Sequence, residues 1–473
     1  MKMQTKFASL GALSASLMAG LPALAQDGPI QNPSVEQMAT MVNKGDTTWM
    51  LLSSVLVLMM AIPALALFYG GLVRTKNMLS LLMQVLVIVS VGAILWIAVG
   101  YSLAFTPGSP YIGGLSKAML AGVGTGTYAA TFSNNVYIPE YAFVIFQMTF
   151  ACITPALIIG AFAERIKFWP LILFCIGWTL LAYYPIAHMV WFWAGPDFLS
   201  VPEYAGDMGL LWGWGALDFA GGTVVHINAG IAGLVGCIVV GKRIGHNKEP
   251  MPPHSLTLTM VGASLLWVGW FGFNAGSNLE SNGLTALAFL NTFVATAAAT
   301  LSWVLVEQIR HGRPSLLGAV TGAVAGLVAI TPAAGFAAPG GALILGLIVS
   351  PVCYIFVSTV KKKFGYDDSL DVFGVHGIGG IVGAIGTGIL ADPSLGGQGW
   401  FDYTVFPAVA GAYDMGAQVW TQIKAVCVTV IWTGVVSLVL FYVIKMVFGL
   451  RPSADDERQG LDQTSHGESA YNY

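Results

Sequence analysis

The sequence predicts an all-α polytopic membrane protein with eleven transmembrane helices. Among its 473 residues, hydrophobic residues make up 56% and charged residues only 9%, which is too little charge to cover a soluble protein of this length. The apolar residues also occur in segments that can cross a bilayer core of about 30 Å. The 58 glycines suit close helix packing in lipid, and the net charge of −3 gives no indication of nucleic-acid binding.

Residues 1–25 are predicted to be a secretory signal peptide. Lys2 and Lys6 form a basic start, an apolar stretch follows, and Ala23-Leu24-Ala25 is typical of a cleavage site. An uncleaved first transmembrane helix is the alternative. Both interpretations place residues 26–46 outside the cell as an external N-terminal segment.

The expected transmembrane domain occupies residues 47–448. After residue 46, eleven apolar segments are long enough, or nearly so, to span the bilayer. The eighth and ninth are short and rich in Gly and Ala. The segments lie at 48–72, 79–104, 141–163, 168–192, 216–241, 256–276, 284–308, 316–334, 341–360, 371–391 and 419–447.

Basic residues predict the orientation of these segments. Lys and Arg follow every odd-numbered segment, as they do in cytoplasmic loops. Odd-numbered segments are therefore expected to run from outside to inside. The protein is expected in the inner (cytoplasmic) membrane with a cytoplasmic tail at 449–473. The longer loops 105–140, 193–215 and 392–418 are expected outside.

Segments five and ten resemble each other. Each contains Leu-Asp, small residues, a His and a Gly-rich apolar stretch, with Asp218 and His226 in one and Asp371 and His376 in the other. The two His lie 150 residues and five segments apart. Because five is odd, equivalent helices point in opposite directions. This pattern predicts a five-plus-five inverted repeat followed by an eleventh helix, with a transport path at the repeat interface.

Ionisable residues inside a membrane are costly and so are candidates for function. Asp218 and Asp371 begin their segments, where each can cap a helix N-terminus; Asp218 can also attract a cation to the entrance. His226 and His376 approach the midplane from opposite sides. They are predicted to line a pore as a neutral hydrogen-bonded pair, the alternative being structural roles. His188 is expected to have a structural capping role.

Aromatic residues and one hydroxyl are predicted to converge at the outer ends of segments three, four and six. Such a group can form a cage for a small cation. The alternative is that these side chains only pack or lie at the membrane interface. The group consists of Phe146, Phe150, Trp191, Trp270, Phe273 and Ser277.

No catalytic or metal-binding motif accompanies these residues. H-E-x-x-H, G-x-S-x-G and a phosphate-binding loop are all absent from the sequence. The five Cys are scattered through apolar segments without a C-x-x-C pair, which is typical of small buried side chains. The chain is therefore not expected to be an enzyme or to hold a metal or another cofactor.

Several longer stretches together resemble a bacterial ammonium transporter of the Amt/Mep/Rh family, over nearly the whole mature length. These stretches are Phe68-Tyr69-Gly70-Gly71-Leu72-Val73-Arg74, Phe150-Ala151-Cys152-Ile153-Thr154, Ala163-Glu164-Arg165, Asp218-Phe219-Ala220-Gly221-Gly222, Gly269-Trp270-Phe271-Gly272-Phe273-Asn274-Ala275-Gly276-Ser277 and Asp371-Val372-Phe373-Gly374-Val375-His376-Gly377.

The resemblance implies particular site residues. It implies an ammonium-binding cage at Phe150, Trp191 and Ser277, a phenyl gate at Phe150 and Phe273, and a twin-His pore at His226 and His376. Asp218 matches an acidic entrance residue. Secondary positions are Phe146, Trp270, Thr331 and Asp371, and a family Ser in segment eight is replaced by Thr321. The loop after Trp191 also holds Trp193, Trp212 and Trp214, so the match of the cage tryptophan is less direct.

The resemblance also implies a homotrimer with one pore per subunit and a cytoplasmic PII-type signal protein that acts through the tail. The expected mechanism is capture of ammonium (or its analogue methylammonium), loss of a proton near the gate, and passage of ammonia along an apolar pore. K⁺ and Na⁺ have no proton to lose and are excluded. The alternatives are a Rh-like gas channel and an ammonium sensor.

Overall fold

The computed structural model describes residues 28–471, so the predicted signal peptide lies outside the described residues. Within that part of the chain, eleven helical segments are long and apolar enough to cross a membrane, which confirms the predicted number. Their bounds are Lys44–Leu72, Thr75–Phe105, Glu140–Phe162, Phe168–Trp191, Gly222–Val240, Leu256–Gly276, Gly283–His311, Leu316–Ala333, Pro339–Phe364, Phe373–Leu390 and Met415–Phe448.

Several of these segments contain more than one helical element. The long elements are α3 (Lys44–Met59), α4 (Leu65–Leu72), α5 (Met78–Leu95), α7 (Glu140–Ile158), α8 (Phe168–Trp178), α9 (Tyr184–Trp191), α11 (Asn228–Val240), α12 (Leu256–Gly276), α13 (Gly283–His311), α14 (Leu316–Ile330), α15 (Pro339–Ile355), α17 (Ile378–Leu390) and α18 (Met415–Phe448). Shorter helices are α2 (Val35–Thr40), α6 (Tyr101–Phe105), α10 (Leu210–Gly213), α16 (Lys361–Phe364) and α19 (Ala454–Gln459).

Polar side chains set where many of these helices begin. Ser255, Asn282, Ser315 and Asp414 each accept a hydrogen bond from a backbone N–H in the first turn of α12, α13, α14 and α18, respectively. Such caps satisfy amides that have no partner inside the helix. The fifth segment differs from the prediction, because its helix begins at Gly222 and not at 216. Gly221 has a φ of 116°, which helical geometry does not allow.

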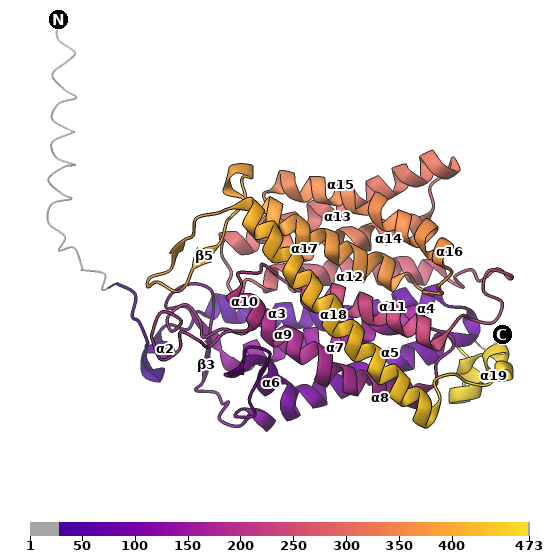
Figure 1. The fold of residues 1–473 in the computed structure, drawn as a ribbon, viewed down its shortest axis with the longest axis horizontal. Coiled ribbons are helices and arrows are strands. Elements are labelled where there is room, and N and C mark those ends of the chain that lie inside the picture. Colours follow the sequence, from indigo (N-terminus) through magenta and orange to yellow (C-terminus); the bar gives the residue numbers. More distant parts are fainter. Residues whose placement is uncertain (1–27, 472–473) are drawn as a thin grey trace, which may run out of the picture.

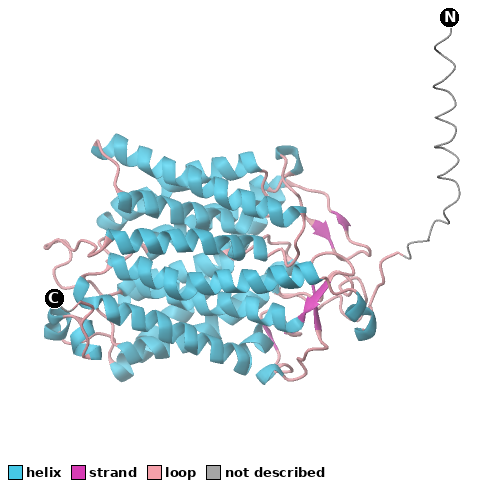
Figure 2. Cartoon of the chain, turned by 180° about the vertical axis from the view of Figure 1, so that it is seen from behind, coloured by secondary structure: helices cyan, strands magenta, loops and turns pink. Residues whose placement is uncertain are grey.

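The membrane-crossing helices form one bundle, with α18 running diagonally across it (Figure 1). Short strands gather at one end of the bundle (Figure 2), and α19 lies at the other end (Figure 1). We call these the outer and inner ends, after the orientation that the basic residues predict. At the outer end, residues 28–43 contact the loops, since Asn32 N–H donates to the Asp197 carbonyl at 3.0 Å.

The loops at the outer end contain three small antiparallel hairpins, which the all-α prediction does not include. They pair β1 (Gly108–Ser109) with β2 (Ile112–Gly113), β3 (Tyr128–Ala130) with β4 (Tyr137–Pro139), and β5 (Phe401–Asp402) with β6 (Val409–Ala410). Each lies outside the membrane-crossing segments, so the transmembrane part is all-α as predicted.

The central membrane-crossing helices are buried within the chain to a larger extent than the peripheral ones. In the apolar part of Gly222–Val240, 83% of residues are buried within the chain, compared with 28% for Met415–Phe448. The helices that carry His226 and His376 cross closely. A Cβ added to Gly230 would lie 2.3 Å from the backbone nitrogen of Gly377. Two glycines thus let the backbones of the repeat-related segments touch.

Candidate functional site

Asp218 caps the N-terminus of the helix in the fifth membrane segment. Its Oδ1 accepts hydrogen bonds from the N–H groups of Gly221 and Gly222, at 2.9 and 2.7 Å. Its Oδ2 accepts from Thr223 and Val224, at 2.9 and 3.1 Å. One carboxylate thus satisfies four amides at a helix start, where negative charge is favoured. The helix-capping role expected from the sequence is what these contacts provide.

The predicted cage residues lie together at the outer end. Trp191, the last residue of α9, places its ring 5.8 Å from Phe150 at nearly a right angle. The Trp191 indole N–H donates to the Asp218 carbonyl at 3.0 Å, which fixes the ring. The Ser277 hydroxyl donates to the Phe273 carbonyl at 2.8 Å, so its oxygen lone pairs remain able to accept a hydrogen bond. All three residues line one outer cavity of about 1340 Å³.

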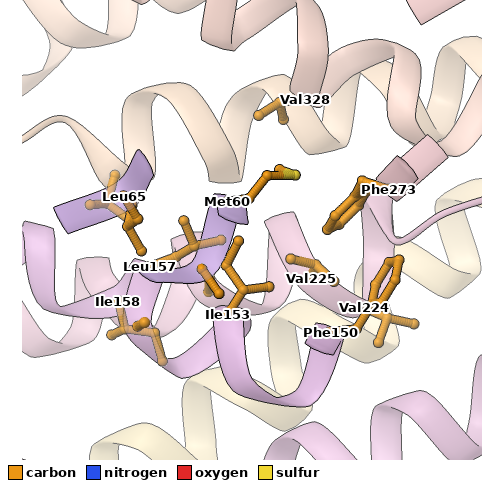
Figure 3. Close-up of a cluster of buried hydrophobic side chains, with 14 of the residues drawn as sticks. Met60, Leu65, Phe150, Ile153, Leu157, Ile158, Val224, Val225, Phe273 and Val328 are labelled. Carbon is orange, nitrogen blue, oxygen red and sulfur yellow. The ribbon is translucent and has the colours of Figure 1, made fainter. Parts of the chain in front are cut away.

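Two phenyl rings close the inner side of this cavity. The rings of Phe150 and Phe273 lie 4.3 Å apart with an interplanar angle of 33°, and both side chains are almost fully buried. Phe146 packs against Phe150 from one turn earlier in α7, at 5.0 Å. Figure 3 shows the two rings at one end of a row of apolar side chains that includes Ile153 and Leu157. The two rings thus lie between the outer cavity, which Phe150 lines, and the small cavity that Phe273 shares with the two His.

The two predicted His meet behind the phenyl rings. The Nδ1 atoms of His226 and His376 are 3.2 Å apart, so one donates and the other accepts. The His226 ring also stacks on Phe273 at 5.9 Å and on Trp270 at 5.3 Å. The Nε2 atom of His226 is buried and has no hydrogen-bond partner among the residues that the structure describes. A buried polar atom without a partner can accept or donate a hydrogen bond to a passing molecule.

Both His lie in π-helical turns, Gly222–Ile227 and Phe373–Gly377. Such turns are rare and often mark functional sites. The imidazoles border a cavity of about 10 Å³ that is otherwise lined by apolar and aromatic side chains. This is about the space that one water-sized molecule needs. The site therefore offers a narrow, mostly apolar space with two polar contacts.

Of the two Thr in the eighth segment, Thr331 belongs to this site. The Trp270 indole N–H donates to the Thr331 hydroxyl at 2.9 Å, which orients the ring beside His226. Thr321 instead donates to the carbonyl of Leu317 in its own helix.

Asp371 does not cap the tenth segment, contrary to one of the roles expected for it. Asp368 does so instead, accepting from the N–H groups of Val372 and Phe373 at 3.0 and 2.8 Å. Asp371 has a positive φ and forms an ion pair with Lys361. Asp368 precedes His376 by the same eight residues that separate Asp218 from His226. That shared spacing is the sequence signal that identifies Asp368 as the repeat counterpart of Asp218.

Ion pairs and hydrogen bonds between charged residues connect the loops at the inner end. Arg243 donates to Asp367 through its backbone N–H and its guanidinium, and Arg165 is fully buried beside the same residue. Although burial opposes ionisation, the hydrogen bonds from Arg243 and the charge of Arg165 hold the pKa of Asp367 below its usual range. Glu164 pairs with Arg74 at 2.5 Å. These contacts hold together the loops around the inner mouth.

The polar tail folds against these loops. Asp462 accepts from the N–H groups of Leu79 and Ser80, at 3.0 and 2.8 Å. Glu457 accepts from Ile244 N–H at 2.8 Å and pairs with Arg451. The tail thus connects the start of α5 to the loop after α11, both of which lie at the inner end.

Comparison with known proteins agrees with this architecture. Residues 48–471 match the profile of the Ammonium Transporter Family. An ammonium transporter of Bacillus subtilis is 46% identical over 429 residues, covering 90% of this chain and 98% of the relative. One from Aquifex aeolicus is 44% identical over 431 residues, covering 91% of this chain and 94% of the relative.

Solved structures show the same fold. Mep2 of Candida albicans superposes with a TM-score of 0.76 at 33% identity, covering 89% of this chain and 88% of that one. A structure titled Sensor Amt Protein has a TM-score of 0.78 at 26% identity, covering 91% of this chain and 99% of that one. The family profile covers most of the chain, and the relatives match over nearly their whole length. The chain is therefore a member of the Ammonium Transporter Family.

Proposed function

We propose that this chain moves ammonium nitrogen through a pore within a single subunit, taking up ammonium at the outer end and passing ammonia along the dry region. Membership of the Ammonium Transporter Family supports the substrate. The geometry at Phe150, Phe273, His226 and His376 supports the mechanism.

The first step is capture of the cation. Phe150 and Trp191 present aromatic rings, and cation–π contact contributes about 0.5–2 kcal/mol per ring. Ser277 adds a hydroxyl oxygen that accepts a hydrogen bond from the ammonium N–H. These groups replace part of the hydration shell, and they leave a monovalent ion with N–H donors held next to the phenyl gate.

The second step is loss of a proton. The passage at the His pair is dry, narrow and without a fixed charge, and carrying an ion across such a region costs at least about 2.5–3.5 kcal/mol. Desolvation lowers the pKa of an amine, so ammonia is the favoured form there. K⁺ cannot take this route because it has no proton to release. The unpartnered Nε2 of His226 gives the ammonia molecule a hydrogen-bonding contact.

The observation that carries this proposal is the direct contact of His226 and His376 at 3.2 Å behind the two tilted phenyl rings of Phe150 and Phe273. A pore for hydrated cations would need polar walls and space at this point. Neither is present around the imidazoles.

Substitution of one His tests the mechanism. Purified protein in liposomes is exposed to ammonium, methylammonium or K⁺ gradients, and the current is measured. His226→Asp should admit K⁺, because an anion lowers the barrier for any monovalent cation. His226→Ala should reduce ammonium conduction without a K⁺ leak. His311→Ala, altered at the inner end, is the matched control. A fully selective His226→Asp protein that conducts like the parent would contradict the proposal.

Sidedness, assembly and control extend the same proposal. We place the protein in the cell inner membrane with the outer end facing out, on the basis of its basic inner loops, and as a homotrimer, on the basis of its family resemblance. A PII-type protein is the proposed regulator at the inner end, where the folded tail adjoins the loops. A gas channel predicts no ammonium-dependent current. A sensor predicts only a small, incidental one. The same liposome assay therefore distinguishes them from the proposal.

A further inference from the structure

Glu280 is a buried carboxylate in the wall of the outer cavity, three residues after Ser277. Its exposed fraction is 6%. Oε1 accepts from Ser133 N–H, and Oε2 accepts from the Ser133 hydroxyl and the Asn282 amide, each at 2.9 Å. Within residues 28–471, no basic side chain forms an ion pair with it. Buried charges are normally paired, so this carboxylate lacks the partner that its burial calls for.

An aromatic wall borders the same cavity. The Trp193 ring stacks on Trp212 at 4.6 Å and on Phe132 at 5.9 Å, and Tyr403 lies 4.6 Å from Trp193. Burial and the nearby charge of Glu280 raise the pKa of the Tyr403 hydroxyl above its ordinary value. Phe132 of the wall directly precedes Ser133, which donates to Glu280, so the wall and the carboxylate adjoin each other in one cavity. These rings come from three loops that are far apart in the sequence.

The chain itself shows that an aromatic ring lining this cavity can hold an ammonium group. The ammonium group of Lys424 lies 5.0 Å from the centroid of the Trp214 ring, and Trp214 also lines the cavity. A ring that lines the same cavity, although outside the wall itself, thus already holds a tethered primary ammonium by cation–π contact.

The charge of the cavity favours the same class of ligand. Among the lining residues in the described part of the chain, Lys117 is the one basic residue, and its side chain pairs with Glu140. The other acidic lining residues are Asp207, Asp218, Glu280, Asp402 and Asp414. A cleft lined by charges of one sign raises the local concentration of counter-ions.

We propose that Glu280 and the wall of Phe132, Trp193, Trp212 and Tyr403 form an outer recruitment site for ammonium-type cations, which concentrates them before they reach the cage. This inference rests on the proposed function. The cavity is far larger than one ammonium ion, so the site accepts methylated ammonium as well as ammonium. Metal cations are then excluded further along the path, at the phenyl gate and in the apolar pore.

Removal of the charge at Glu280 tests the site. Saturable methylammonium uptake is measured in proteoliposomes at low and high sodium chloride for the parent, Glu280→Gln and Asp402→Asn. Asp402 is the matched control, because its carboxylate lines the same cavity but bonds only to Thr404 of its own loop. At low salt, Glu280→Gln should raise the half-saturation concentration about two- to fivefold, the order expected for one screened charge. Its maximal rate should stay unchanged, and high salt should remove most of the difference.

Two results would overturn the site: an unchanged half-saturation concentration in Glu280→Gln, or an equal rise in Asp402→Asn, which would indicate only a general field. Trp212→Leu leaves the Glu280 hydrogen bonds in place and should also raise the half-saturation concentration. This variant therefore tests the recruitment site even if Glu280→Gln does not fold. No effect in a folded Trp212→Leu protein would also overturn the site. Absence of saturable uptake by the parent would instead contradict the proposed function.

Discussion

Replacing Gly230 by Ala tests whether the close crossing of the two His-bearing helices creates the pore. The added Cβ would lie 2.3 Å from the Gly377 nitrogen and 2.4 Å from its Cα, whereas ordinary contact begins near 3.4 Å. The backbones must therefore separate by about 1 Å, and overpacking of this kind costs about 1–3 kcal/mol. A shift of that size stretches the 3.2 Å contact between His226 and His376 beyond hydrogen-bonding distance.

We expect Gly230→Ala to lower the thermal unfolding midpoint and to abolish most ammonium-dependent current in liposomes. Gly434→Ala is the matched control in another membrane helix. Its added Cβ meets only Ile231 Cγ2, at 3.8 Å, so both stability and current should match the parent. If Gly230→Ala unfolds at the parent temperature and conducts normally, the glycine contact does not set the spacing of the His pair.

Two further predictions concern the two ends of the pore. Trp191→Leu should raise the half-saturation concentration for methylammonium uptake several-fold, because it removes one cation–π contact worth about 0.5–2 kcal/mol. An unchanged concentration dependence in well-expressed protein would refute the cage assignment. Deletion of residues 452–473 should leave the protein assembled, as judged by size-exclusion chromatography in detergent, and abolish inhibition by a PII-type protein. Persistent inhibition of the truncated protein would show that the tail is not needed for this control.

The sequence was sufficient for the number of membrane segments and for most of their bounds. Each segment must satisfy its own backbone hydrogen bonds in lipid, so apolar length alone identifies it. The sixth segment, 256–276, matches the structure at both ends. The fifth was predicted six residues too early, because 216–221 is mostly apolar apart from Asp218 but contains a glycine with positive φ that hydropathy does not reveal.

The convergence of the candidate site residues was predictable where a repeat or a family motif marked them. The structure brings Phe150, Trp191, Ser277 and Asp218 to one cavity, as the resemblance implied. The capping role expected for Asp371 was wrong, because it was assigned from the Leu-Asp pair that the two segments share. The eight-residue spacing to the following His, which Asp368 shares with Asp218, indicates the capping residue instead. Only hydrogen-bond geometry separates a capping carboxylate from one three residues away that pairs with Lys361.

The sequence by itself determined the fold class, the inverted repeat and the pairing of His226 with His376, because hydropathy and spacing are properties of the chain as written. Tertiary structure decided what surrounds those residues. Glu280 and the stacked rings of Trp193 and Trp212 come from loops whose meeting depends on three-dimensional packing, and no periodicity in the sequence encodes it. The contact of Gly230 with Gly377 is of the same kind. A missing side chain permits a close approach in many places, but the packing of the whole bundle selects where two backbones touch.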